Sequence, residues 1–315
     1  MQNRQLGTSS LEVSPLCFGC NVFGWTADEE MSFRLLDGWL DAGFNFYDTA
    51  DVYSRWHDGN EGGESETIMG KWLASRGGRD KIVLATKFGM DMGDGKVGLS
   101  PEYMVRAVED SLRRLQTDYI DLYQSHKDDE NTPVDATLEA YAKLIEQGKV
   151  REIGASNFSA TRMKEALDAS ETKGLPRYQS LQPLYSLVER DTFEGDLENL
   201  CAAENVGVIG FYSLASGFLT GKYRSKADME GRIRAPRVEK YVTEDGFRVL
   251  DALDAVAKKH NAKMGQVALA WLMARPSVTS PIASATNMDQ LAELTATVEL
   301  SLDADDIAKI DEASK

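Results

Sequence analysis

The chain has 315 residues, of which 42% are apolar and 27% charged, and its formal net charge is −16. This is the composition of an ordinary globular protein, and the acidic balance argues against nucleic acid or an anionic membrane as a partner. No apolar run is long enough to span a bilayer, and Gln2, Asn3 and Arg4 precede any apolar stretch, so we expect no membrane span or secretory signal. The expectation is a cytoplasmic enzyme that acts on a small molecule.

The number and spacing of the cysteines and histidines argue against two further classes of protein, those built on disulfides and those that bind metals. Cys17, Cys20 and Cys201 are too few for a disulfide framework or a zinc site, and we interpret Cys17 and Cys20 as reduced thiols at the end of a strand. No clustered histidines or H-x-H motif follow the first strand. A metal enzyme is therefore disfavoured, and no metal ligands are predicted.

After a predicted hairpin over residues 4–15, strand-like and helix-like segments alternate to the end of the chain. The best-defined helix start is Ser100-Pro101, an N-cap serine followed by proline at the first helical position. We predict strands over 16–20, 44–47, 82–86, 120–124, 150–155, 178–181, 206–212 and 278–283. We predict helices over 28–42, 64–75, 101–115, 134–147, 160–170, 196–204, 244–260, 264–274, 288–297 and from 303 onward.

Eight strand–helix units in sequence are typical of a closed (β/α)8 TIM barrel, here with an N-terminal β-hairpin and two extra helices. We expect residues 1–315 to form one domain. The alternative, a doubly wound open sheet, is less favoured because no G-x-G-x-x-G motif follows the first strand. Segment 215–243 has no clear periodicity and is rich in Lys and Arg. It is either a solvated loop or a mobile cofactor and substrate loop over the barrel end.

Four side chains with complementary chemistry lie at or just beyond the ends of three successive predicted strands. They are Asp48, Lys87 and His126, with Tyr53 one short loop after Asp48. Because the carboxyl ends of barrel strands meet at one face, we expect these groups to form one site. A tyrosine with a reference pKa of about 10 becomes a better acid beside an ammonium that a carboxylate holds in place. Each residue alone has an ordinary structural explanation, but together they suit protonation of a carbonyl oxygen while hydride reaches carbon.

Three long stretches, 43–53, 111–123 leading to His126, and 147–157, resemble the aldo-keto reductase superfamily, and the resemblance covers nearly the full length. The resemblance implies a barrel and a catalytic set of Asp48, Tyr53, Lys87 and His126, none of them substituted. It also implies a nicotinamide cofactor, with NADP(H) favoured and NAD(H) kept open.

The resemblance carries cofactor contacts onto particular positions. Ser156, Asn157 and Gln182 match residues that hold the nicotinamide amide, and Tyr212 matches the ring that stacks on it. The complete predicted cofactor set is Gly19, Cys20, Asn21, Asp48, Ser156, Asn157, Gln182, Tyr212, Ser213, Leu214, Gly217, Lys222, Arg232, Ser284, Thr286, Asn287 and Gln290.

One position departs from the family pattern. Asn287 stands where the family commonly has a basic residue that pairs with the 2′-phosphate of NADPH, and no Lys or Arg falls between Arg275 and Lys309. A phosphate without a cation loses its strongest kind of partner. One alternative to a basic residue is that Ser284, Thr286 and the N-terminus of the next helix bind the phosphate. The other is an arginine of the 215–243 segment: Arg232, Arg234 or Arg237.

The function predicted from the sequence is NAD(P)H-dependent reduction of aldehydes or ketones, with Tyr53 as the proton donor. One alternative is an NAD-dependent dehydrogenase of sugars or other secondary alcohols. Another is a redox-sensing regulatory subunit that resembles potassium-channel β-subunits. Trp25, Trp56 and Phe88 are predicted to line an apolar substrate pocket. Such a pocket suits many carbonyl compounds and does not identify one of them. The sequence predicts no oligomeric state.

Overall fold

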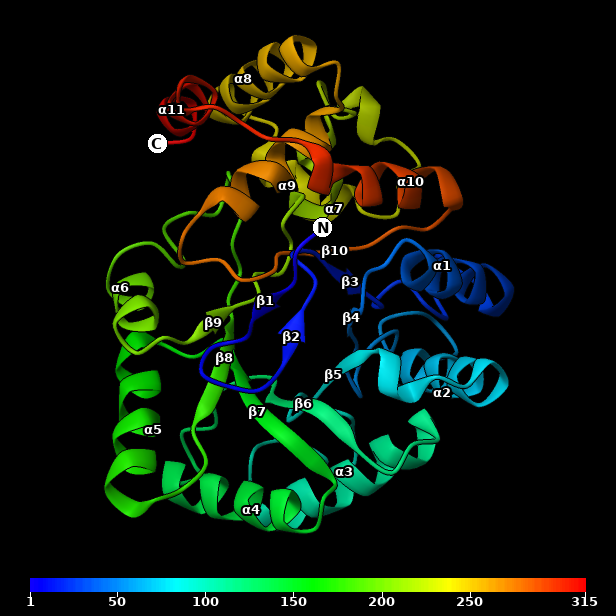
Figure 1. Cartoon of the computed structure of the whole chain (residues 1–315). Helices are drawn as coiled ribbons and strands as arrows, with labels where there is room; N and C mark the ends of the chain where they lie inside the picture. The colour runs from blue at the N-terminus through cyan, green and yellow to red at the C-terminus, as the bar shows by residue number, and fades with distance from the viewer.

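The computed structural model describes residues 1–315. Eight parallel strands form one sheet in the order β10-β3-β4-β5-β6-β7-β8-β9, which Figure 1 shows curling into a barrel. The strands are β3 (Cys17–Gly19), β4 (Phe46–Asp48), β5 (Val83–Phe88), β6 (Ile120–Ser125), β7 (Val150–Ser156), β8 (Tyr178–Gln182), β9 (Gly207–Val208) and β10 (Ile282–Ala283).

Backbone hydrogen bonds between the first and last strands of this order close the sheet. Thr279 donates its N–H to the carbonyl of Val208 at 2.8 Å, and Ile282 donates to Gly210 at 2.9 Å. A parallel bridge also joins Val208 to Val278. Closure leaves no unpaired edge strand, which confirms the predicted (β/α)8 barrel and excludes the open doubly wound sheet.

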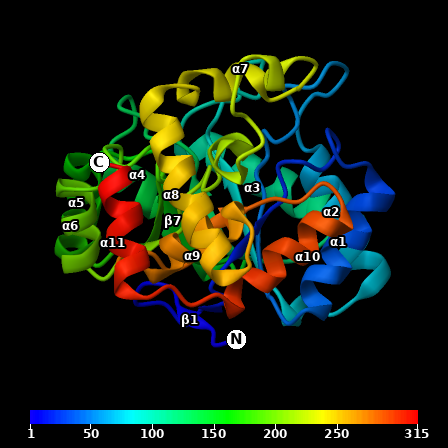
Figure 2. The same cartoon turned by 90° about the horizontal axis from the view of Figure 1, so that it is seen from above.

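The helices lie where the sequence predicts them, within a few residues at each end. Those around the sheet are α1 (Glu29–Asp41), α2 (Glu64–Arg76), α3 (Pro101–Leu115), α4 (Val134–Glu146), α5 (Ala160–Lys173), α6 (Asp196–Ala203), α9 (Met264–Ala274) and α10 (Met288–Ala296). The helix α3 begins as its sequence predicts, because the Ser100 hydroxyl accepts the N–H of Tyr103. Two further helices, α8 (Glu244–His260) and α11 (Ala304–Ala313), lie side by side outside this ring (Figures 1 and 2).

The two last strands are shorter than predicted, for identifiable reasons. Tyr212, in the predicted strand 206–212, has φ of 55°, a left-handed conformation that a strand cannot contain. In the predicted strand 278–283, Pro281 has no N–H to give to a ladder, and regular pairing begins only at Ile282.

The barrel interior and the helix-facing layer are separate hydrophobic clusters. The interior holds Cys17, Phe46, Val83, Ala85, Leu122, Ile209 and Ile282, joined by Leu6, Leu11 and Val13 of the N-terminal hairpin. That hairpin, β1 (Arg4–Gln5) and β2 (Glu12–Val13), therefore covers one end of the barrel. Figure 2 shows it at the end opposite α7 (Ala235–Val238).

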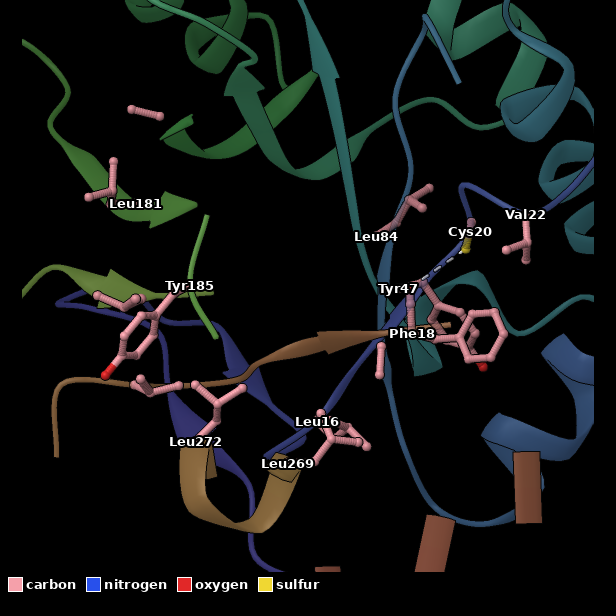
Figure 3. Packing of buried hydrophobic residues seen from close by; sticks show 14 of the residues in the cluster. Leu16, Phe18, Cys20, Val22, Tyr47, Leu84, Leu181, Tyr185, Leu269 and Leu272 are labelled. Carbon is pink, nitrogen blue, oxygen red and sulfur yellow. Dashed lines mark hydrogen bonds between the residues drawn. The ribbon is translucent and has the colours of Figure 1, made fainter. Parts of the chain in front are cut away.

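A larger cluster fills the space between strands and helices. Figure 3 shows part of it around Phe18 and Tyr47, including a hydrogen bond of 3.8 Å from the Cys20 thiol to the Phe18 carbonyl. All three cysteines are free and buried, as predicted for Cys17 and Cys20. None of the helices combines the length and apolar character that crossing a membrane requires.

Segment 215–243 is irregular, as predicted, but it contains short helical turns. These are η2 (Ala215–Thr220), η3 (Ala227–Met229), α7 and η4 (Glu239–Tyr241). Phe218, Leu219 and Val238 are fully buried and fix parts of the segment to the barrel, whereas Arg232 and Ile233 are exposed. The segment is therefore anchored at several points, and its mobility stays a prediction.

Candidate active site

The period of two along a strand decides which side chains enter the barrel. Phe46 belongs to the interior cluster, so Asp48, two residues later, points the same way at the C-terminal end of β4. By the same alternation Lys87 follows Ala85 on β5, and Gln124 and His126 follow Leu122 from β6.

Asp48 and Lys87 form a buried ion pair. The Lys87 Nζ lies 2.7 Å from Asp48 Oδ2, and the two side chains are 0% and 1% exposed. A second hydrogen bond runs from Nζ to the Thr49 carbonyl at 2.8 Å. Two buried charges are tolerated here because each is paired and hydrogen-bonded.

Tyr53 places its hydroxyl on this pair. The Lys87 ammonium donates to the Tyr53 oxygen at 2.7 Å, and the Tyr53 hydroxyl donates to Asp48 Oδ2 at 3.2 Å. Lys87 Nζ also lies 4.5 Å from the centre of the Tyr53 ring. The three side chains predicted from sequence to act together are thus in direct contact.

The pKa of Tyr53 is raised well above its ordinary value, first by burial and then by the Asp48 carboxylate. This corrects the expectation that Lys87 lowers that pKa, because desolvation and the carboxylate outweigh the ammonium when the phenol is buried. The consequence is that Tyr53 holds its proton across the neutral pH range. A proton donor, unlike a phenolate base, needs that state.

His126 is neutral. Burial, followed by the charge of Lys87, lowers the pKa of its imidazole well below its ordinary value. The ring lies edge-on to that of Tyr53 with centroids 6.0 Å apart, and its Nδ1 is buried without a hydrogen-bond partner. A neutral imidazole has one N–H and one acceptor nitrogen, which suits it to orient an uncharged polar group beside Tyr53.

Two glutamine amides complete the hydrogen bonding of Asp48. Gln182 donates to Asp48 Oδ1 at 2.9 Å, and Gln124 donates to the same oxygen at 3.3 Å. Gln124 was not predicted as a site residue. Its position two residues before His126 on an inward-facing strand is the signal that would have identified it.

A cavity of about 1060 Å³ opens above these residues at the C-terminal end of the barrel. Its wall includes most of the sequence-predicted positions, and Tyr212 presents a ring that is 39% exposed. The predicted residues that line it are Asn21, Tyr53, Trp56, His126, Ser156, Asn157, Gln182, Tyr212, Ser213, Leu214, Gly217, Lys222, Ser284 and Gln290.

Ser156 and Asn157 are held in place at the edge of this cavity. The Ser156 hydroxyl donates to the Gln182 carbonyl at 2.8 Å, and the Asn157 amide donates to the His126 carbonyl at 2.9 Å. Asn157 and Tyr212 have φ of 57° and 55°. Left-handed backbone at non-glycine residues costs about 1–3 kcal/mol each and is concentrated at functional sites.

Four cations line the cavity without a carboxylate partner: Lys127, Lys222, Arg234 and Arg237. Burial, and then the charge of Arg234, lowers the pKa of Lys222, and burial with the charge of Arg237 lowers that of Arg234. Cations without an acidic partner, among them the half-buried Arg234, are suited to form charge-assisted hydrogen bonds with an anion. This arrangement fits the phosphate groups of a dinucleotide. Of the predicted Arg232 and its two neighbours Arg234 and Arg237, only the latter two reach the cavity.

The region of Asn287 differs from its predicted use. Asn287 caps α10, where its Oδ1 accepts the N–H of Gln290 at 2.9 Å. Thr286 donates its hydroxyl to Gln290 Oε1 at 3.1 Å, and Ser284 donates to Asn21 at 2.7 Å. Neither Thr286 nor Asn287 lines the cavity, and the same is true of Gly19 and Cys20.

Phe88 does not line the substrate pocket, so that prediction is wrong. Phe88 alternates with the inward-facing Lys87 on β5 and therefore faces the helices, where it is fully buried and stacks on Tyr123 at 4.9 Å. Trp56 is 40% exposed and lines the cavity, whereas Trp25 lies behind it with ring centroids 5.6 Å apart.

Several cavity residues were not predicted from the sequence. Met90, Asp91 and Lys127 follow the strands β5 and β6, and their place just beyond strand ends was the available clue. Gly265 and Gln266 of α9 and Glu293, Leu294 and Thr297 near α10 reach the cavity only through the packing of these helices.

A closed α/β barrel in which a tyrosine at the cavity wall contacts a buried lysine and aspartate is the arrangement of a barrel enzyme. The model of the Aldo/keto reductase family matches residues 15–315, so the chain belongs to that family and is an oxidoreductase. The family generally uses NAD(P)H and acts on small carbonyl substrates.

Individual relatives cover almost the whole chain. The chain is 39% identical to the oxidoreductase YrpG of Bacillus subtilis (strain 168), over 96% of this chain and 93% of that protein. It is 33% identical to a probable voltage-gated potassium channel subunit beta of Oryza sativa subsp. japonica, over 93% and 90%. It is 31% identical to the L-glyceraldehyde 3-phosphate reductase of Escherichia coli (strain K12), over 99% and 92%.

Proposed function

We propose that this oxidoreductase reduces aldehydes or ketones to alcohols with NAD(P)H, and that Tyr53 gives the proton to the carbonyl oxygen. The observation that carries the proposal is the Tyr53 hydroxyl at 2.7 Å from the Lys87 ammonium, at the cavity wall. A phenol with a raised pKa keeps its proton, and the adjacent ammonium stabilises the negative charge left when that proton departs.

NAD(P)H, when bound, supplies the hydride for the carbonyl carbon. Tyr53 then protonates the oxygen, while Lys87 holds the resulting phenolate through its existing hydrogen bond. Asp48 keeps Lys87 charged and oriented, and His126 is placed to position the carbonyl oxygen through a ring N–H.

The cavity residues also suggest how the cofactor is held. Ser156, Asn157 and Gln182 offer polar groups for the nicotinamide amide, and the exposed ring of Tyr212 offers a stacking face. Lys222 and Arg234 are suited to the phosphates. The family resemblance favours NADPH, and because Asn287 is not basic we propose that the unpaired Arg234 receives its 2′-phosphate.

The potassium-channel relative supports a second candidate, a redox-sensing regulatory subunit that turns substrate over poorly. An NAD-dependent dehydrogenase is the third, because Asn287 is occupied as a helix cap and offers no cation to a 2′-phosphate. We further propose that residues 1–315 act as one unit in which segment 215–243 moves over the cofactor.

The test combines cofactor binding with turnover. We expect protein fluorescence titrations to show at least roughly tenfold tighter binding of NADPH than of NADH, and Arg234→Gln to weaken NADPH binding by about ten- to hundredfold. We also expect NADPH oxidation with glyceraldehyde 3-phosphate or benzaldehyde. Binding without turnover of any carbonyl compound would favour the regulatory subunit, and equal or tighter NADH binding would favour the dehydrogenase.

A further inference from the structure

Arg237 has no carboxylate partner, and its contacts at the cavity wall are with aromatic side chains. Arg224 and Lys240 of the same segment are paired with Asp251 and Glu189, but no carboxylate lies within ion-pair distance of Arg237. Its guanidinium lies instead over two indole rings, 5.8 Å from the centre of Trp56 and 5.9 Å from that of Trp25. One N–H donates to the Tyr212 hydroxyl at 3.1 Å. The remaining donors are free at the cavity wall.

The position of Trp56 places Arg237 on the reacting side of the cavity. The Trp56 ring lies 5.9 Å from the ring of Tyr53, so one aromatic side chain separates the guanidinium from the proposed proton donor. Lys222, in contrast, lies over the ring of Tyr223, and the charge of Arg234 helps to lower its pKa. Of the cations of segment 215–243 at the cavity wall, Arg237 is the one in contact with Trp56 and Tyr212.

A guanidinium held beside aromatic rings keeps N–H groups available for an anion. These cation–π contacts hold it beside the rings, and the free N–H groups match the oxygens of a carboxylate or phosphate. Lys127 adds a second positive charge to the cavity wall. The nearby acidic wall residue, Asp91, directs its carboxylate back to its own loop, where Oδ1 accepts the N–H of Gly93 at 2.7 Å.

We propose that Arg237 is a specificity residue that receives an anionic group of the substrate, so that the preferred substrates are aldehydes or ketones bearing a carboxylate or phosphate a few bonds from the carbonyl. This inference rests on the proposed carbonyl reduction. It adds to that function a substrate class and the residue that selects it.

The experiment compares two matched pairs of aldehydes with NADPH as the cofactor. One pair is glyceraldehyde 3-phosphate and glyceraldehyde, and the other is 4-carboxybenzaldehyde and its methyl ester. We expect kcat/KM of the wild-type protein to favour the anionic member of at least one pair by about tenfold or more. The pair that shows the preference tells phosphate from carboxylate.

Three variants then assign the preference to Arg237. Arg237→Gln is expected to reduce the anionic-to-neutral ratio of kcat/KM by roughly ten- to hundredfold, mainly through KM, and Arg237→Lys is expected to restore part of it. Arg224→Gln removes the same charge from the same segment outside the cavity and is expected to leave the ratio unchanged.

Each contrary outcome has a distinct meaning. A wild-type protein that reduces the neutral aldehydes without preferring anions, or an Arg237→Gln variant that keeps the preference, overturns the inference alone. A variant that loses NADPH affinity and reduces both members of a pair equally poorly makes Arg237 a cofactor ligand and also overturns it. If none of the four aldehydes is reduced, the proposed function fails and the inference fails with it.

Discussion

The buried ammonium of Lys87 donates all three of its hydrogen bonds to oxygen atoms of the site. Its Nζ donates to Asp48 Oδ2 at 2.7 Å, to the Thr49 carbonyl at 2.8 Å and to the Tyr53 hydroxyl at 2.7 Å. Asp48 in turn receives Gln182 and Gln124 on its other oxygen. The pair is therefore a fully satisfied charge network, which fixes the position of Tyr53 as well as its electrostatics.

Removing the lysine should leave a buried carboxylate without its counter-charge. We expect Lys87→Met to lower the free energy of unfolding by about 3–5 kcal/mol, measured by urea denaturation, and the double change with Asp48→Leu to recover most of it. Lys71→Met breaks a half-exposed pair with Glu29 and should cost no more than about 1 kcal/mol. Equal losses for the two lysines would contradict the account of the buried pair.

Tyr53 should be essential for chemistry but not for cofactor binding. We expect Tyr53→Phe to lower kcat for carbonyl reduction by about 10²–10⁴-fold while the NADPH Kd changes little, because only the transferable proton is lost. Tyr123→Phe is the matched control, since its hydroxyl is buried without a hydrogen-bond partner and faces away from the cavity. Retention of normal turnover by Tyr53→Phe would refute the proton-donor role.

His126 should make stability depend on pH. Its folded-state pKa lies below the unfolded value of about 6.5, so the unfolded chain binds one more proton as the pH falls below that value. The contribution of His126 to stability is therefore complete above about pH 6.5 and declines by up to about 1.4 kcal/mol per pH unit below it. Relative to wild type, His126→Gln should weaken the pH dependence of the unfolding free energy between about pH 5 and 6.5.

The control for this pH effect is His57→Gln, because His57 is an exposed loop residue. It should follow the wild-type curve throughout. A His126→Gln curve parallel to wild type over this window would show that the buried imidazole does not resist protonation.

Segment 215–243 should become resistant to proteolysis when cofactor binds. Lys226 and Arg232 are exposed tryptic sites between the cavity-lining Lys222 and Arg234. An anion held by those two residues should order the backbone between them. We expect saturating NADPH to slow cleavage there by roughly tenfold, with cleavage after Lys96, an exposed loop residue outside the segment, unchanged. Identical cleavage rates with and without NADPH would count against a moving segment.

Much of the fold and the grouping of the proposed catalytic residues could be predicted from the sequence. Eight alternating strand and helix patterns specify a barrel, because parallel strands joined by helices bury both faces of a sheet. The positions of Asp48, Lys87 and His126 followed as well, because residues at parallel strand ends meet at one barrel face. Phe88 shows the limit of that rule. It also lies at a strand end, but the two-residue period of the strand turns its side chain away from the barrel interior.

What the sequence by itself determined was the order of elements, the closed barrel and the identity of the reactive groups, all of which depend on local periodicity and on the end of each strand. Tertiary structure alone decided the rest. It showed that burial and Asp48 raise the pKa of Tyr53, that Asn287 is occupied as a helix cap, and that Arg234 and Arg237, but not Arg232, reach the cavity. These properties depend on desolvation and on contacts between distant segments, which no local pattern encodes.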